Sequence, residues 1–207
     1  MHTFPWRELR YALWLPVYLV LFVVLEHIPN RTYWVTDLPI DGAIPFCEWF
    51  ILPYCLWFPL MFGVGLWLLL RHPAAFRRYM LFLGLTFLST EVLWIFWPNA
   101  QNLRPAVLPR DNALTAIVSA LYHIDTNTNV FPSLHVVGAV GVALAARDAC
   151  PRQHLVWGGM TALAALICAS TLFVKQHALL DVAGGLLWSL PAAVWVYRGA
   201  LSRRRRT

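Results

Sequence analysis

A histidine and an aspartate lie four residues apart in the segment FVKQHALLD, which covers residues 173–181. At the start of a helix this spacing places His177 and Asp181 on one face. The carboxylate can then accept a proton from one imidazole nitrogen and leave the lone pair of the other nitrogen free to attack. Lys175 lies two residues earlier and is a candidate contact for an anion. The segment therefore favours a nucleophilic histidine.

A second histidine occurs about 40 residues earlier, in the segment FPSLHV at residues 131–136. Pro132 suits the first turn of a helix, where the free N–H groups and the Ser133 hydroxyl form an anion site. His135 follows in the same turn and can give a proton to a leaving oxygen. Two histidines and a carboxylate beside an anion site are side chains that can transfer a phosphoryl group.

The composition indicates an integral membrane protein. Of 207 residues, 59% are hydrophobic and only 13% are charged, with a mean hydropathy of +0.59, which is outside the range of soluble domains. We expect an all-α fold, a bundle of six transmembrane helices in a single domain over residues 1–207. Each predicted span is near the length that crosses about 30 Å of hydrocarbon, although the fourth is short. The six stretches are 11–25, 49–70, 79–97, 133–146, 155–174 and 178–197.

The distribution of positive charge predicts the orientation. Six spans place 12 of the 16 Lys and Arg residues on the side of the two termini and four on the other side. The positive-inside rule then puts both termini in the cytoplasm. The net charge of +6 thus reflects topology and not nucleic-acid binding. The run Arg203–Arg206 is interpreted as a stop-transfer anchor, with contact to anionic membrane lipid as the alternative.

This topology gathers the candidate site on the extracytoplasmic side. Arg104 joins it there, because its guanidinium is suited to bidentate phosphate binding. The six candidate residues are Arg104, Ser133, His135, Lys175, His177 and Asp181. The four cysteines show no paired spacing, so we expect no disulfide, no metal site and no cofactor. Glu91, inside the third span, either faces the substrate cavity, braces a basic residue, or packs within the bundle.

The arrangement resembles the type 2 phosphatidic acid phosphatase superfamily, whose six-helix members carry the motifs Lys-x6-Arg-Pro, Pro-Ser-x-His and Ser-Arg-x5-His-x3-Asp. The resemblance covers the six spans, with the motifs within residues 97–185. It implies that His177 is the nucleophile of a phosphohistidine intermediate, that Asp181 orients it, and that His135 is the general acid. It also implies that Arg104 and Ser133 bind phosphate.

Two positions depart from these motifs, because Trp97 and Thr171 stand where the family has its lysine and second arginine. Lys175 is the candidate replacement for one of them. The sequences PSLH and STLFVKQH are similar to the inositol phosphorylceramide synthase branch, which passes a lipid head group between alcohols. The resemblance thus implies a phosphotransferase, with a plain hydrolase as the alternative.

We therefore expect a multi-pass enzyme, in the plasma membrane, that acts on a lipid phosphate at the extracytoplasmic face. Phosphatidate, a polyprenyl pyrophosphate and a sphingolipid acceptor all fit the pattern. One rival is a non-catalytic lipid-binding or transport protein with a vestigial anion pocket, and another is a structural membrane subunit. The presence of His135, His177 and Asp181 together argues against both.

Overall fold

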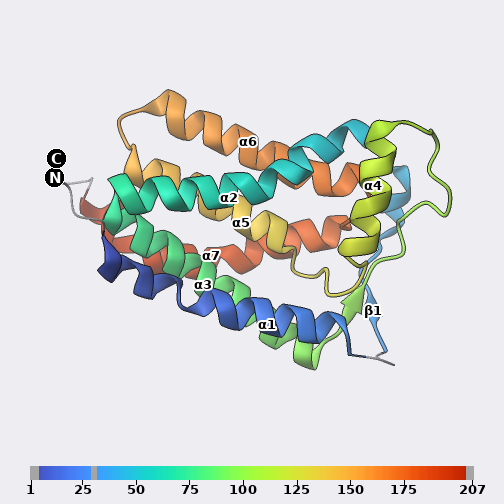
Figure 1. Cartoon of the computed structure of the whole chain (residues 1–207), viewed down its shortest axis with the longest axis horizontal. Helices are drawn as coiled ribbons and strands as arrows, with labels where there is room; N and C mark the ends of the chain where they lie inside the picture. The colour runs from blue at the N-terminus through green and yellow to red at the C-terminus, as the bar shows by residue number, and fades with distance from the viewer. Residues whose placement is uncertain (1–4, 29–31, 204–207) are drawn as a thin grey trace.

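The computed structural model describes residues 5–28 and 32–203 and consists mostly of helices that run side by side (Figure 1). Arg31 and Arg204–Arg206, which contributed to the charge count, lie outside the described residues. The α-helices are α1 (Trp14–Glu26), α2 (Ile51–Arg71), α3 (Pro73–Phe96), α4 (Ala113–Ile124), α5 (Leu134–Ala149), α6 (His154–Phe173) and α7 (Leu179–Arg203). The 3₁₀ helices are η1 (Trp6–Ala12), η2 (Pro39–Ala43) and η3 (Glu48–Phe50). Two short strands, β1 (Trp34–Val35) and β2 (Asn99–Ala100), complete the fold.

Five helical segments among the described residues are long and apolar enough to cross a membrane. They are Trp6–Glu26, Glu48–Arg71, Pro73–Phe96, His154–Phe173 and Leu179–Arg198. The sixth predicted span forms α5, which has 16 residues. At 1.5 Å per residue it rises about 24 Å, less than the hydrocarbon thickness. Helix length and composition thus support an integral membrane protein with five of the predicted spans, and they do not establish the count of six.

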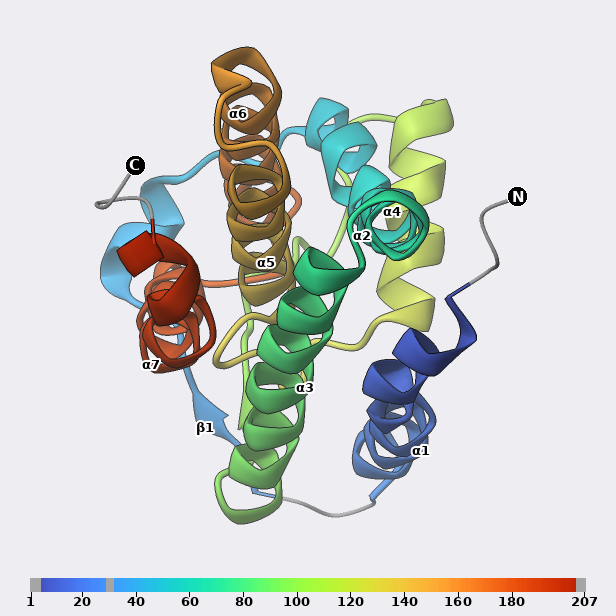
Figure 2. The same cartoon turned by 90° about the vertical axis from the view of Figure 1, so that its left-hand side faces the viewer.

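Helix α5 is enclosed by other helices, so it can be shorter than the bilayer is thick. It packs against α2, α3, α6 and α7, and Figure 2 shows it between the ends of α6 and α3. Most of its residues are buried, including Gly138 and Gly141, where the side chains of Trp57 and Phe82 approach closely. A helix whose neighbours are protein does not need to match the bilayer along its whole length. Helix α1, by contrast, packs mainly against α3 and leaves most of its surface exposed.

The connecting segments gather at one end of the bundle. Helix α4, β1 and the loops around them lie opposite η1 and the end of α7 (Figure 1). Strand β1 pairs in parallel with β2, with Trp34 beside Asn99 and Val35 beside Ala100. The segment 98–132, between α3 and α5, contains α4, which begins at a cap where the Asn112 side chain accepts from two backbone N–H groups. This end of the bundle therefore has a structured cover.

Helix α7 approaches the start of α5 through two glycines. A Cβ at Gly185 would lie 2.9 Å from the Ser133 carbonyl oxygen and 2.9 Å from Val136 Cβ. A Cβ at Gly184 would overlap the ring of Phe131. Both approaches are closer than van der Waals contact allows, so the close packing of α7 on α5 depends on residues without a side chain at these two positions.

We expect Gly185→Ala to lower the apparent melting temperature in detergent, because the new methyl group must push α7 away from α5 at a cost of about 1–3 kcal/mol. Gly159→Ala in α6 is the matched control, since nothing lies within 4 Å of its Cβ position. The control should melt at the same temperature as the wild type or above it. Thermal unfolding followed by circular dichroism makes the comparison, and equal melting temperatures for the two variants would contradict the close-approach argument.

Candidate active site

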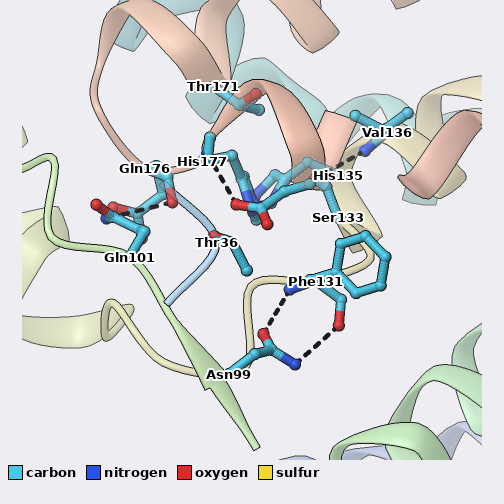
Figure 3. A network of polar contacts seen from close by, with 12 residues as sticks. Thr36, Asn99, Gln101, Phe131, Ser133, His135, Val136, Thr171, Gln176 and His177 are labelled. Atoms are coloured by element: carbon cyan, nitrogen blue, oxygen red, sulfur yellow. Dashed lines mark hydrogen bonds and ion pairs between the residues drawn. The ribbon is translucent and has the colours of Figure 1, made fainter. Parts of the chain in front are cut away.

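Two imidazole rings meet at the covered end of the bundle. His135 lies in the first turn of α5, and His177 lies in the bend between α6 and α7. His177 Nε2 is 3.3 Å from His135 Nδ1, and Figure 3 shows the two labelled side chains next to one another. Their exposed fractions are only 6% and 8%. The structure thus brings together two histidines that are far apart in the sequence.

Asp181 stands on the other side of the His177 ring. Its Oδ2 lies 3.5 Å from His177 Nδ1 and accepts the Ala178 N–H at 2.8 Å. We predicted that both residues lie within the first turns of the last helix, which is wrong for His177, because α7 begins only at Leu179. The N–H of His177 donates instead to the Thr171 carbonyl at the end of α6. The histidine is therefore fixed by the end of one helix and oriented by the start of the next.

Ser133 is the N-cap of α5, so Pro132, which was expected in the first turn of this helix, precedes it. The Ser133 hydroxyl accepts the Val136 N–H at 3.4 Å, and the Ser133 N–H donates to the Asp181 carbonyl at 3.1 Å. The preceding Phe131–Pro132 peptide bond is cis. Asn99 of β2 holds Phe131 from both sides, because its Oδ1 accepts the Phe131 N–H at 2.7 Å and its Nδ2 donates to the Phe131 carbonyl at 3.0 Å (Figure 3). The free N–H groups of the first turn of α5 thus have a rigid position beside the histidines.

Arg104 reaches this region through Gln176. Its guanidinium donates to Gln176 Oε1 at 2.7 Å, to the Tyr122 carbonyl at 3.0 Å and to the Asp125 carbonyl at 2.5 Å. The guanidinium also lies over the Tyr122 ring. Burial lowers the pKa of Arg104 and the nearby Asp125 opposes that shift, so the side chain keeps its charge at neutral pH. Arg104 therefore places a positive charge next to the side chain of Gln176, the residue that precedes His177.

Lys175 points to a different neighbour. Its Nζ donates to the Asp41 carbonyl at 2.9 Å, while Asp41 Oδ1 accepts the Leu179 N–H at 2.8 Å. Burial lowers the pKa of the Lys175 ammonium, and the Asp41 carboxylate opposes that shift. Residues on both sides of His177 are thus tied to η2.

The two positions that depart from the family motifs supply no replacement charge. Trp97 packs against Trp34, and the Thr171 hydroxyl donates to the Cys168 carbonyl.

A cavity of ≈ 400 Å³ opens beside the two histidines. Both His135 and His177 line it, as does Gln176, whereas Arg104, Lys175 and Asp181 do not. The rings of Tyr54 and Trp57 lie 4.5 Å and 4.6 Å from that of His135 and fix its orientation.

Glu91 does not line this cavity. Its side chain is fully buried, and neither carboxylate oxygen has a partner among the described residues. Of the alternatives for Glu91, the structure favours packing within the bundle.

Several polar residues that hold the site were not singled out from the sequence. Gln176 Nε2 donates to the Asp125 carbonyl at 3.1 Å, and Gln101 Nε2 donates to the Lys175 carbonyl at 3.0 Å. Asn99 and Gln101 occupy alternate positions in an extended segment, so they share a face. Two buried amides at such spacing beside the Arg-Pro pair are a signal that could have marked them. Gln176 adjoins the nucleophile candidate, which is the signal for that residue.

A family model described as the PAP2 superfamily matches residues 39–195, well over half of the chain. The matched range contains all six candidate residues. Searches of curated proteins and of solved structures returned no match.

We expect Gln176→Met to lower the melting temperature in detergent. The substitution leaves an Arg104 N–H and the Thr126 carbonyl without the partner that Gln176 supplies, and each orphaned group costs about 1–3 kcal/mol. For a chain of this size that corresponds to roughly 2–4 °C per kcal/mol. Gln153→Met is the matched control, because Gln153 is exposed before α6. Equal melting temperatures would contradict the role given to the Gln176 amide.

Proposed function

Because the chain belongs to the PAP2 superfamily, we propose that it is a lipid phosphotransferase or phosphatase that works through a phosphohistidine on His177. The observation that carries this proposal is the contact of His177 with His135 on one side and Asp181 on the other, at the wall of a cavity. The family supports phosphatase-type activity on a lipid phosphate. The intermediate, the residue roles and the side of the membrane are our proposal.

His177 is the proposed nucleophile. Asp181 Oδ2 faces Nδ1, so the ring proton resides on Nδ1 and the lone pair remains on Nε2. Nε2 is also the nitrogen that faces His135 and the cavity. The 3.5 Å separation from Asp181 shortens when Nδ1 gains positive charge during attack, as expected for a catalytic hydrogen bond in the absence of substrate.

His135 is the proposed general acid, which protonates the oxygen that departs from phosphorus. In-line displacement needs the nucleophile and the leaving oxygen on opposite sides of phosphorus. A phosphoryl group with its leaving oxygen does not fit in the 3.3 Å between the two nitrogens. Substrate binding must therefore part the rings, with the phosphate displacing the contact between them.

Fixed positive groups stabilise the equatorial oxygens in this proposal. The first turn of α5 offers free N–H groups at its Ser133 cap, and Arg104 offers a guanidinium behind Gln176. Lys175 contributes from its contact with the Asp41 carbonyl, at longer range. Such preorganised groups act strongly because little water competes in a buried site. This set of charges is the reason we assign the reaction no metal ion.

The shape of the cavity supports a lipid substrate. A second cavity, of ≈ 640 Å³, shares five lining residues with the one beside the histidines. The shared residues are Leu15, Leu19, Trp57, Phe58 and Met61, from α1 and α2. The second cavity is lined by apolar and aromatic side chains as far as Leu69 and Phe76. We propose that the acyl or prenyl chain lies in this groove between α1 and α2 with the phosphate at the histidines.

We propose further that α5 completes a six-span topology, with both termini in the cytoplasm and the site at the extracytoplasmic face of the plasma membrane. Nine described cations lie in η1, at the junctions of α2 with α3 and of α5 with α6, and towards the end of α7, all at the opposite end from the site: Arg7, Arg10, Arg71, Arg77, Arg78, Arg147, Arg152, Arg198 and Arg203. Arg104, Arg110 and Lys175 lie at the site's end. The excess of positive charge away from the site supports this orientation.

Transfer and hydrolysis differ only in whether an alcohol or water reaches the phosphoenzyme. The replacement of two basic motif residues by Trp97 and Thr171 supports the phosphotransferase branch, because a less positive site is less suited to a dianionic monoester. We therefore propose transfer to an alcohol, with plain hydrolysis as the alternative reaction of the same intermediate.

We expect His177→Ala to lower phosphate release from lipid phosphates by roughly four orders of magnitude or more, because the nucleophile is lost. The melting temperature in detergent should stay near that of the wild type. His123→Ala, which removes an exposed histidine at the end of α4, is the control and should keep wild-type turnover. Turnover retained in His177→Ala would refute the assignment of the nucleophile.

A further inference from the structure

The cavity beside the histidines has a polar wall that the phosphoryl chemistry does not use. It consists of Glu26 at the end of α1 and of Asp125, Thr126, Thr128 and Asn129 in the segment after α4. These five residues are called the acidic wall below. They line the same cavity as His135 and His177. The acidic wall therefore faces whatever approaches the histidines.

The two carboxylates of the acidic wall have neutral partners. Glu26 Oε1 accepts the Asn129 amide at 3.0 Å, and Oε2 accepts the Thr126 hydroxyl. Asp125 Oδ2 accepts the Tyr54 hydroxyl at 2.7 Å. Among the described residues, no ion pair neutralises either carboxylate, and no Lys or Arg lines the cavity. Arg104 interacts electrostatically with both carboxylates but does not line the cavity, so the charged side chains of the acidic wall itself are both negative.

Unused hydrogen-bonding capacity in the same cavity points to a ligand. Asn129 is 5% exposed, and its Oδ1 has no partner among the described residues. His135 also lines the cavity, and its Nε2 has no partner in the part of the chain that the structure describes. A carboxylate can accept about four hydrogen bonds, and each of these two accepts fewer. Buried polar atoms are rarely left unsatisfied, so this wall is suited to a ligand that donates.

The hydrogen-bond donors and acceptors of the acidic wall favour one class of ligand over others. The acidic wall offers acceptors in Glu26, Asp125 and Asn129, but Thr126 and Thr128 can both donate and accept. A hydroxyl also donates and accepts, whereas an ammonium group only donates. A phosphate oxygen only accepts and would be repelled by the carboxylates. The combination therefore fits a molecule with several hydroxyl groups better than an amine or a second phosphate.

We propose that the acidic wall is the binding site for the acceptor, a polyhydroxylated alcohol that takes the phosphoryl group from His177; this inference rests on the proposed function. In the transfer step the alcohol oxygen bonds to phosphorus while the bond from phosphorus to His177 Nε2 breaks. The electron pair of that bond stays on the nitrogen. The alcohol proton passes to His135, which has given its own proton to the first leaving oxygen.

The partition of the phosphoenzyme between alcohol and water tests this proposal. Purified wild-type protein is given phosphatidate, polyprenyl pyrophosphate or phosphatidylinositol as donor, with myo-inositol, ethanolamine or methanol as acceptor. The ratio of the acceptor's phosphate ester to the hydrolysis product is then measured in each reaction. At equal concentrations we expect the ratio for myo-inositol to exceed those for methanol and ethanolamine by about tenfold or more. This is the gain in binding that one hydrogen bond to a charged group provides.

Two variants locate the effect in the acidic wall. Glu26→Gln should lower the myo-inositol ratio by about tenfold, the effect of losing a charged acceptor, and should leave the methanol ratio unchanged. Thr128→Val removes one hydroxyl at nearly constant volume and should lower the same ratio. Asp111→Asn, an exposed carboxylate in the loop before α4, is the matched control and should keep all ratios and the basal turnover.

The outcomes separate the two proposals. Any of three results would overturn the acceptor site while the phosphohistidine mechanism stands. They are equal ratios for myo-inositol and methanol, a higher ratio for ethanolamine than for myo-inositol, and a myo-inositol ratio that Glu26→Gln leaves unchanged. No turnover with any donor would refute the proposed function. Saturation-transfer NMR of myo-inositol then tests the wall without turnover: a signal that Glu26→Gln weakens supports the site, and the lack of a wild-type signal overturns it.

Discussion

The active-site end of this fold depends on one hydrogen bond, from the Ser133 N–H to the Asp181 carbonyl. It joins the first turn of α5 to the first turn of α7, so it places His135 and His177 opposite one another. The bond can form because Gly185 lets α7 lie against the Ser133 carbonyl and Val136. Residues in two separate motifs thereby share one cavity wall. If the two helix starts moved apart, the imidazole contact and the proposed proton transfer would be lost together.

The loops around that contact are buried, and their backbone groups must find partners in the protein. Asn99 holds the segment before Ser133, Gln101 and Gln176 hold the segment before His177, and Asp41 caps the start of α7. These amides and this carboxylate fix the positions of the histidines without touching the reacting atoms. In the proposed mechanism the two rings part to admit phosphate, and a rigid frame lets them return to the same geometry after each reaction.

Local signals such as apolar runs and short motifs predict the longest spans and bring His135, His177 and Asp181 into one candidate site, where the structure also places them in contact. These signals do not predict that α5 is central and short, because enclosure by four helices depends on packing. The spacing of His177 and Asp181 predicts that their side chains are neighbours, and the structure places them 3.5 Å apart. It also predicts that both lie in the helix, whereas α7 begins at Leu179, with the Asp181 carboxylate accepting the Ala178 N–H. Lys175 was expected near phosphate, and the structure places its Nζ on Asp41. Contacts such as Gln176 with Arg104 join residues far apart and leave no local pattern.

The account's central claim is that a nitrogen of His177 carries the phosphoryl group. The most direct measurement is to react the protein with a lipid phosphate labelled with ³²P, quench within one turnover, and map the label by mass spectrometry. The account predicts a phosphoprotein that is stable in alkali and labile in acid, with the label on His177 and none in His177→Ala. Label on another residue, or product formed in a competent enzyme whose quenched protein carries no label, would contradict it.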